Sequence, residues 1–130
     1  AFIAKTFFQP GDTVSVDTPL YAEIQGDFES RVTLKYVHEN LFKGTLLKRV
    51  IRAKEDGSKG YVIVNANNPQ GTPTRRVKSE GGEWAAKNTD FTIVFDEMYI
   101  NLVHGKAKTC SSVEYAVQSP NVQTIRGFAK

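Results

Sequence analysis

Hydrophobic residues in this 130-residue chain alternate with polar residues, or form short runs that stop at turn residues. A period of two is typical of β-strands, and no window of roughly 11 or more residues shows a convincing helical stripe. The pattern predicts about a dozen short strands. They are Phe2–Phe8, Thr13–Val16, Tyr21–Ile24, Arg31–Val37, Thr45–Ala53, Tyr61–Ala66, Thr74–Lys78, Phe91–Phe95, Met98–Val103, Lys106–Cys110, Val113–Val117 and Val122–Phe128.

The segments between these strands are rich in turn residues. They include Gln9–Asp12, Gln25–Asp27, Glu55–Gly57, Asn67–Gly71, Gly81-Gly82 and His104-Gly105. The last of them predicts a hairpin between Met98–Val103 and Lys106–Cys110, because glycine at the second turn position tolerates a positive φ. Short strands at this spacing predict an all-β fold, an antiparallel two-sheet sandwich or a closed barrel, in a single domain over residues 1–130.

Composition indicates the general class of protein and its compartment. The 40% apolar content is that of a globular domain, and no run approaches the ~18 apolar residues that a membrane helix needs. Residues 1–8 are too short and too interrupted by Lys5 for a signal peptide, although an earlier one is compatible with the chain. The only cysteine, Cys110, forms no internal disulfide, which favours a reducing compartment, so a cytoplasmic or non-classically secreted location is favoured.

Basic residues gather in two short groups, and the net charge is +3. The groups are Lys48, Arg49, Arg52 and Lys54, and then Arg75, Arg76 and Lys78. A binding groove for single-stranded nucleic acid needs aromatic residues among such cations, and none lies between Lys48 and Lys54. We therefore interpret the groups as solvated surface and expect no nucleic-acid partner.

Few residues point to chemistry. His38, His104 and Cys110 are the only imidazole and thiol side chains, and their spacing does not indicate a metal site. Asp96 and Glu97 directly follow a predicted strand. Adjacent strand residues point to opposite faces, so the two cannot flank one bond; we expect both to end a strand in solvent. No phosphate-binding loop or nucleophile elbow is present, so the sequence predicts no cofactor and no enzyme.

The order of the segments resembles the galectins, which are β-galactoside-binding lectins. The resemblance rests on Phe8–Val16, Tyr61–Asn65, Asp90–Phe95, Tyr99–Lys106 and Val122–Gly127. It implies a jelly-roll (galectin-like) sandwich that binds a glycan or glycoconjugate, and it leaves a homodimer open.

Galectins hold sugar with H-x-N-x-R, an asparagine on the next strand, and W-x-x-E-x-R. In one alignment Arg52 is kept, and Lys48 and Val50 replace the histidine and the first asparagine; in another, His38 and Asn40 are kept and the arginine is lost. Trp84 lies well beyond the stacking position, and we interpret it as a core residue. The resemblance implies a ligand-binding set of Lys48, Arg52, Asn65, Arg75 and Arg76.

Two functions remain open from the sequence. The first is carbohydrate binding with altered specificity for acidic or sulfated glycans, since arginine and lysine suit anions better than neutral hydroxyls. The alternative is a protein-interaction or self-association module on a lectin-like sandwich that has lost sugar binding. Neither hypothesis is enzymatic.

Overall fold

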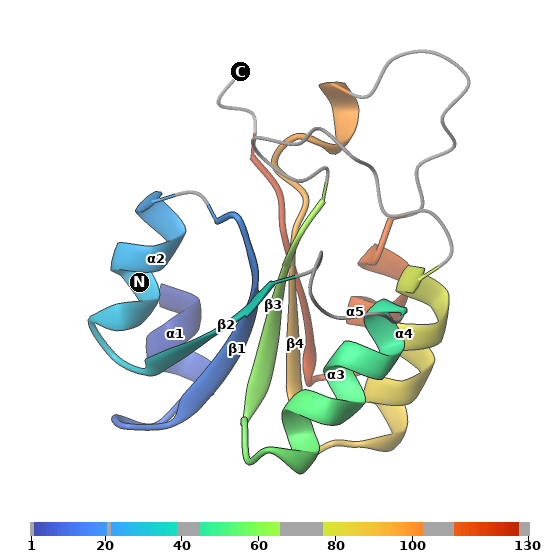
Figure 1. The fold of residues 1–130 in the computed structure, drawn as a ribbon. Coiled ribbons are helices and arrows are strands. Elements are labelled where there is room, and N and C mark those ends of the chain that lie inside the picture. The colour runs from blue at the N-terminus through green and yellow to red at the C-terminus, as the bar shows by residue number, and fades with distance from the viewer. Residues whose placement is uncertain (1, 21, 39–44, 66–76, 103–110, 128–130) are drawn as a thin grey trace.

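The computed structural model describes residues 2–20, 22–38, 45–65, 77–102 and 111–127. At its centre lies one five-stranded sheet in the order β2-β1-β3-β4-β5, and every neighbouring pair is parallel (Figure 1). The strands are β1 (Thr13–Thr18), β2 (Thr33–His38), β3 (Gly60–Val64), β4 (Thr92–Asp96) and β5 (Val122–Ile125). The prediction of an all-β, antiparallel two-sheet sandwich is therefore wrong, and the fold is α/β.

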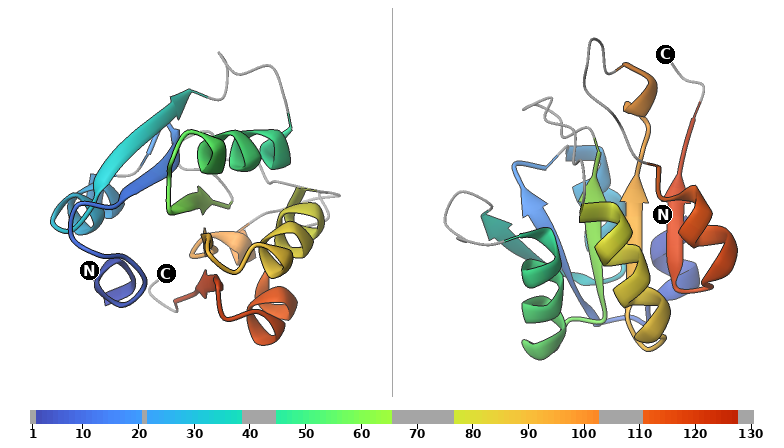
Figure 2. Two further views of the ribbon diagram at one scale, coloured as in Figure 1. Left: turned by 90° about the horizontal axis from the view of Figure 1, so that it is seen from below. Right: turned by 90° about the vertical axis from the view of Figure 1, so that its right-hand side faces the viewer.

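Helices cover both faces of the sheet and supply the crossovers that parallel strands require (Figure 2). They are α1 (Phe2–Phe7), α2 (Ala22–Glu29), α3 (Leu46–Glu55), α4 (Val77–Lys87) and α5 (Val113–Gln118), with a short 3₁₀-helix, η1 (Ile100–Leu102). One core lies between the sheet and α1 and α2, and a second lies between the sheet and α3, α4 and α5. No helix among the described residues has the length and apolar character needed to cross a membrane. That residues 1–130 form one domain stays a prediction.

The central strands are buried on both faces, which is why they read as short apolar runs in the sequence. In β3, Val62 packs with α1 and α2, whereas Tyr61 and Ile63 pack on the opposite side. Gly60 begins this strand where the backbone passes close to its neighbours. A Cβ built there would lie 2.6 Å from both the Phe8 ring and the Thr92 carbonyl oxygen.

The strand predicted over Thr45–Ala53 is wrong, because most of this segment forms helix α3. Leu46, Val50 and Ala53 are buried at a spacing of four and then three residues, which is the stripe of an amphipathic helix. Thr45 caps the first turn by accepting a hydrogen bond from a backbone N–H. The helix spans only ten residues and its buried face includes Arg49, so a search for long apolar periodicity missed it.

Other predicted strands also form helices. Phe2–Phe8 contains α1, Tyr21–Ile24 overlaps α2, and Val113–Val117 lies in α5. Helices this short carry little periodicity of their own, so tertiary packing decides their conformation. Gly81-Gly82, predicted as a turn, lies inside α4.

The predicted hairpin is wrong in its first arm. Within Met98–Val103 the described residues form a turn and then η1 instead of a strand. Its turn and second arm, His104-Gly105 and Lys106–Cys110, lie outside the described residues, as does most of Thr74–Lys78. Trp84 is a core residue as expected, because its ring packs edge-on against Phe91 with 5.4 Å between ring centroids.

Candidate functional site

The carboxyl ends of all five strands lie along one edge of the sheet, the upper edge in Figure 1. Open parallel sheets bind ligands outside this edge, near the point where the strand order reverses. Here the reversal lies between β1 and β3, because the chain runs outward from β1 to β2 and then returns to β3. The strands end at Thr18, His38, Val64, Asp96 and Ile125.

A cavity of about 230 Å³ lies at this edge on the side of α1 and α2. Six apolar side chains from α1, α2 and the sheet line it: Phe2, Ile3, Ile24, Phe28, Val62 and Ile125. Two carboxylates, Asp27 and Asp96, join them. The cavity is therefore largely apolar, with its acidic groups at defined positions.

Asp96 is the buried carboxylate of this cavity, and its residue is only 7% exposed. Burial raises the pKa of Asp96; the Met98 N–H opposes this shift, and the charge of Glu97 adds to it. Among the described residues, the carboxylate accepts one hydrogen bond, from the Met98 N–H at 3.0 Å. A carboxylate in this setting gains most from a cationic N–H partner that enters the cavity.

Asp17, near the end of β1, lies on the opposite face of the sheet and is fully engaged. Arg49 of α3 donates from Nε and Nη2 to its two oxygens, each at 3.1 Å, and Tyr61 donates its hydroxyl hydrogen bond. Burial acts to lower the pKa of Arg49, but the charge and hydrogen bonds of Asp17 outweigh it, so the pKa is raised. This cluster ties α3 to the first and third strands.

Glu97 follows Asp96 and points to the face that carries α5. Its side chain is 0% exposed and forms an ion pair with Arg126, at 3.1 Å between Nη2 and Oε2. The backbone and hydroxyl of Ser112 donate to its other oxygen at 2.8 and 2.9 Å. The expectation that Asp96 and Glu97 point to opposite faces is confirmed, but the expectation that they end a strand in solvent is wrong.

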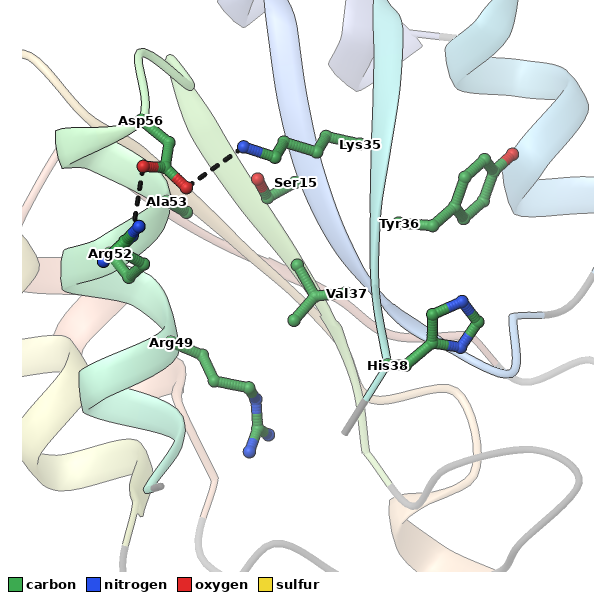
Figure 3. Close-up of a pocket in the computed structure, with 9 residues that line it drawn as sticks. All are labelled: Ser15, Lys35, Tyr36, Val37, His38, Arg49, Arg52, Ala53 and Asp56. Carbon is green, nitrogen blue, oxygen red and sulfur yellow. Dashed lines mark hydrogen bonds and ion pairs between the residues drawn. The ribbon is translucent and has the colours of Figure 1, made fainter. Parts of the chain in front are cut away.

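A larger cleft of about 440 Å³ lies between α3 and the β1 and β2 strands (Figure 3). Lys35 and Arg52 both form ion pairs with Asp56, each at 3.1 Å. The hydrogen bond from Lys35 lowers the pKa of Asp56; burial opposes this shift, and the nearby charge of Arg52 adds to it. The cations of this cleft are therefore matched by carboxylates.

The structure does not gather the residues that the galectin resemblance implied. Lys48 and Arg52 are exposed on α3 and not on a concave sheet. Asn65 follows β3 at the carboxyl edge, is 1% exposed, and donates its N–H to the Asp96 carbonyl at 2.8 Å. Arg75 and Arg76 lie outside the described residues. That any of these five contacts a ligand stays a prediction.

The fold and the site together define a class: a parallel α/β domain with a ligand cavity at the carboxyl ends of its strands. Within that class, the chain belongs to the aminotransferase class I and II family, whose model matches residues 1–130. No curated protein matches the chain.

Solved structures share this fold. An aspartate aminotransferase from Thermus thermophilus with maleate is 25% identical with a TM-score of 0.78, over 98% of this chain and 34% of that one. An aminotransferase from Mycobacterium tuberculosis is 22% identical with a TM-score of 0.79, over 99% and 35%. Cystalysin from Treponema denticola, whose structure contains pyridoxal 5′-phosphate, is 14% identical with a TM-score of 0.76, over 95% and 33%. The chain spans about a third of the length of each.

These matches correct the functional predictions. The galectin resemblance is wrong, and with it the glycan partner, because the matching family is one of aminotransferases. The expectation that the chain is not enzymatic is wrong for the same reason. The resemblance arose from short apolar segments between turn residues, a pattern that the buried parallel strands here share with a sandwich.

The sequence held a signal for the site that was missed. The run from Phe91 to Phe95 is apolar except for Thr92 and leads directly into Asp96 and Glu97. Apolar runs of this kind are typical of parallel strands buried on both faces, and polar residues directly after them lie at the ligand-binding edge.

Proposed function

We propose that the full-length protein containing this chain is an aminotransferase that uses pyridoxal 5′-phosphate to move an amino group between an amino acid and a keto acid. The observation that carries the proposal is Asp96, a buried carboxylate in an apolar cavity at the carboxyl edge. Membership of the aminotransferase family and the cofactor of the Treponema cystalysin structure support it.

The residues of the cavity fit this cofactor. Enzymes that use pyridoxal 5′-phosphate commonly place an aspartate beside the pyridinium nitrogen of its ring. Asp96 has the acceptor capacity for that N–H, because the structure gives its carboxylate a single hydrogen bond among the described residues. The apolar side chains around it, including Phe2, Phe28 and Val62, suit the faces of an aromatic ring.

The residues of the cavity would then set the protonation of the cofactor ring and limit its contact with water. Pyridoxal 5′-phosphate, when bound, supplies an electron sink that stabilises negative charge developing at the α-carbon of an amino acid. Asp96 would hold a proton on the ring nitrogen, because an anion nearby favours the cationic form of that nitrogen. The apolar side chains of the lining offer water few partners beside this ion pair, which would strengthen it.

The proposal also requires a lysine to hold the cofactor. None of the residues described around the cavity is a lysine. Lys130 follows the last residue of β5, Ile125, by five positions, and Ile125 pairs directly with Asp96 in the sheet. Lys130 lies outside the described residues, and its sequence position makes it the candidate. Borohydride reduction of the loaded protein followed by peptide mapping would identify the lysine.

The test is an absorbance titration of the full-length protein with pyridoxal 5′-phosphate, followed by an assay of amino-group transfer. The wild type is expected to bind and to turn over, and Asp96→Asn to lose turnover on the order of 100-fold, as on loss of one preorganised electrostatic partner. Asp90→Asn is the matched control, because Asp90 is an exposed carboxylate just before the same strand, paired with Lys54. No binding by the wild type, or full activity of Asp96→Asn, would contradict the proposal.

A further inference from the structure

The Glu97 carboxylate accepts hydrogen bonds from several donors, and the proposed function gives Glu97 no role. Ser111 donates its hydroxyl at 2.9 Å, and Arg126 donates from Nε at 3.2 Å and from Nη2 at 3.1 Å. The hydroxyl and backbone N–H of Ser112 complete the set. A buried carboxylate is stable only when it is matched in this way, since breaking such a pair leaves an uncompensated charge.

These contacts fasten the end of β4 to its surroundings. Arg126 directly follows the end of β5, and Ser112 directly precedes α5. The Glu97 N–H also donates to the Ile125 carbonyl at 2.9 Å, and the Ser112 hydroxyl contacts that of Thr124 in β5 at 2.8 Å. The backbone at the end of β4 is therefore held from its neighbouring strand and from α5.

The Asp96 side chain, by contrast, has few contacts that fix its position. The only hydrogen bond that the structure gives its side chain among the described residues comes from the Met98 N–H, two residues along the same chain. Because adjacent residues of a strand point to opposite faces, the backbone that Glu97 fixes also sets the direction of the Asp96 side chain. Among the described residues that line the cavity, the other side chains are apolar except for Asp27, so none of them is a cation that could hold the Asp96 carboxylate.

We propose that Glu97 is a positioning residue for Asp96: its contacts with Ser112 and Arg126 on one face hold the Asp96 carboxylate in the cavity on the other face. The role in cofactor binding rests on the proposed function, whereas the positioning of the carboxylate does not. A group that only stabilised the fold would change the melting temperature and leave the surroundings of Asp96 unaltered.

The test uses the full-length protein and separates two properties of the Glu97 side chain, its charge and its length. Glu97→Asp keeps the charge but is one methylene shorter, so it cannot reach Ser112 and Arg126 together; Glu97→Gln keeps the reach and loses the charge. Carboxyl ¹³C NMR then measures the pKa of Asp96 without cofactor, and absorbance titration measures affinity for pyridoxal 5′-phosphate. Asp27, the other carboxylate of the cavity, is unchanged in every variant and serves as an internal reference.

In Glu97→Asp we expect the pKa of Asp96 to fall towards its ordinary value, because a carboxylate released from its position becomes hydrated. We expect cofactor affinity to fall about 10-fold, as on loss of an orienting outer contact, with a smaller loss in Glu97→Gln. If Glu97→Asp does not fold, Ser112→Ala, which removes one hydroxyl donor, is expected to shift the pKa in the same direction.

An Asp96 pKa that is the same in wild type and in a folded Glu97→Asp or Ser112→Ala variant would overturn the inference. The two proposals fail separately. If the wild type binds no pyridoxal 5′-phosphate but the pKa of Asp96 falls in the variant, the proposed function is wrong and the positioning role stands.

Discussion

Two carboxylates lie at the carboxyl edge of the sheet, Asp17 near the end of β1 and Asp96 at the end of β4, and they differ in what surrounds them. Asp17 accepts two hydrogen bonds from Arg49 and one from Tyr61. Asp96, on the opposite face, accepts one from a nearby backbone N–H within the part of the chain that the structure describes, and it faces a largely apolar cavity. Burial alone therefore does not mark a functional group here. The difference lies in acceptor capacity, which is used inside the fold at Asp17 and which the proposed function assigns to the cofactor at Asp96.

The largest effect on stability is expected from breaking the engaged cluster. Arg49→Ala leaves the partly buried Asp17 carboxylate without its cation, so we expect a loss of about 3 kcal/mol in the free energy of unfolding. Urea denaturation of the full-length protein measures it. Because the cluster lies on the other face from the cavity, affinity for pyridoxal 5′-phosphate should stay within about 2-fold of wild type, a difference below ~0.4 kcal/mol.

Two results would break the comparison at Asp17. A loss well under 1 kcal/mol would show that the cluster is not structural. A large fall in cofactor affinity, with the variant folded, would show that Asp17 serves the site as well. Asp17→Asn in the Arg49→Ala background is the control, because it removes the uncompensated charge and should recover part of the lost stability.

A smaller effect on stability is expected from Gly60, the first residue of β3, where a substitution changes only the packing. Gly60→Ala places a methyl group against the Phe8 ring and the Thr92 carbonyl oxygen. The backbone oxygen has little room to move, so we expect a loss of about 2 kcal/mol in the free energy of unfolding, as for overpacking elsewhere. Gly26→Ala is the matched control, because a Cβ there meets nothing within 4 Å. Equal stability of the two variants would contradict this account of the packing.

The smallest effect is a dependence of stability on pH that belongs to Asp96. Its pKa is raised in the folded protein, so the ionised form costs stability above that pKa. As the pH falls through the folded pKa towards the ordinary value, this cost disappears, and the contribution of Asp96 to the free energy of unfolding rises. Asp96→Asn should remove the dependence. The difference between wild type and Asp96→Asn, measured without cofactor, should therefore shrink as the pH falls; a difference that grows would have the wrong sign.

The sequence predicted the positions of several strands and missed how they are joined. Thr13–Val16, Tyr61–Ala66 and Phe91–Phe95 overlap β1, β3 and β4, because short apolar runs between turn residues mark buried strands. The helices were missed because α1 and α5 have only six residues each, and α3 places a buried arginine in its apolar stripe. Without those helices, a parallel sheet cannot be told from an antiparallel sandwich.

Only part of the candidate site could be predicted from the sequence. The opposite directions of Asp96 and Glu97 follow from strand geometry alone. Their burial does not, because the partners of Glu97 are Ser112 and Arg126, which are 15 and 29 residues away in the chain. Lys48 and Arg52 were chosen from a resemblance in pattern, and such a resemblance cannot show which helix or strand a side chain lies on.

The most direct test of the account is the pKa of the Asp96 carboxyl in the full-length protein, measured by ¹³C NMR before and after saturation with pyridoxal 5′-phosphate. The account predicts a pKa above the ordinary value of aspartate without the cofactor and one clearly below it when the cofactor is bound, because a cationic nitrogen then favours the ionised carboxylate. A pKa that saturation leaves unchanged would contradict the assignment of this carboxylate to the cofactor.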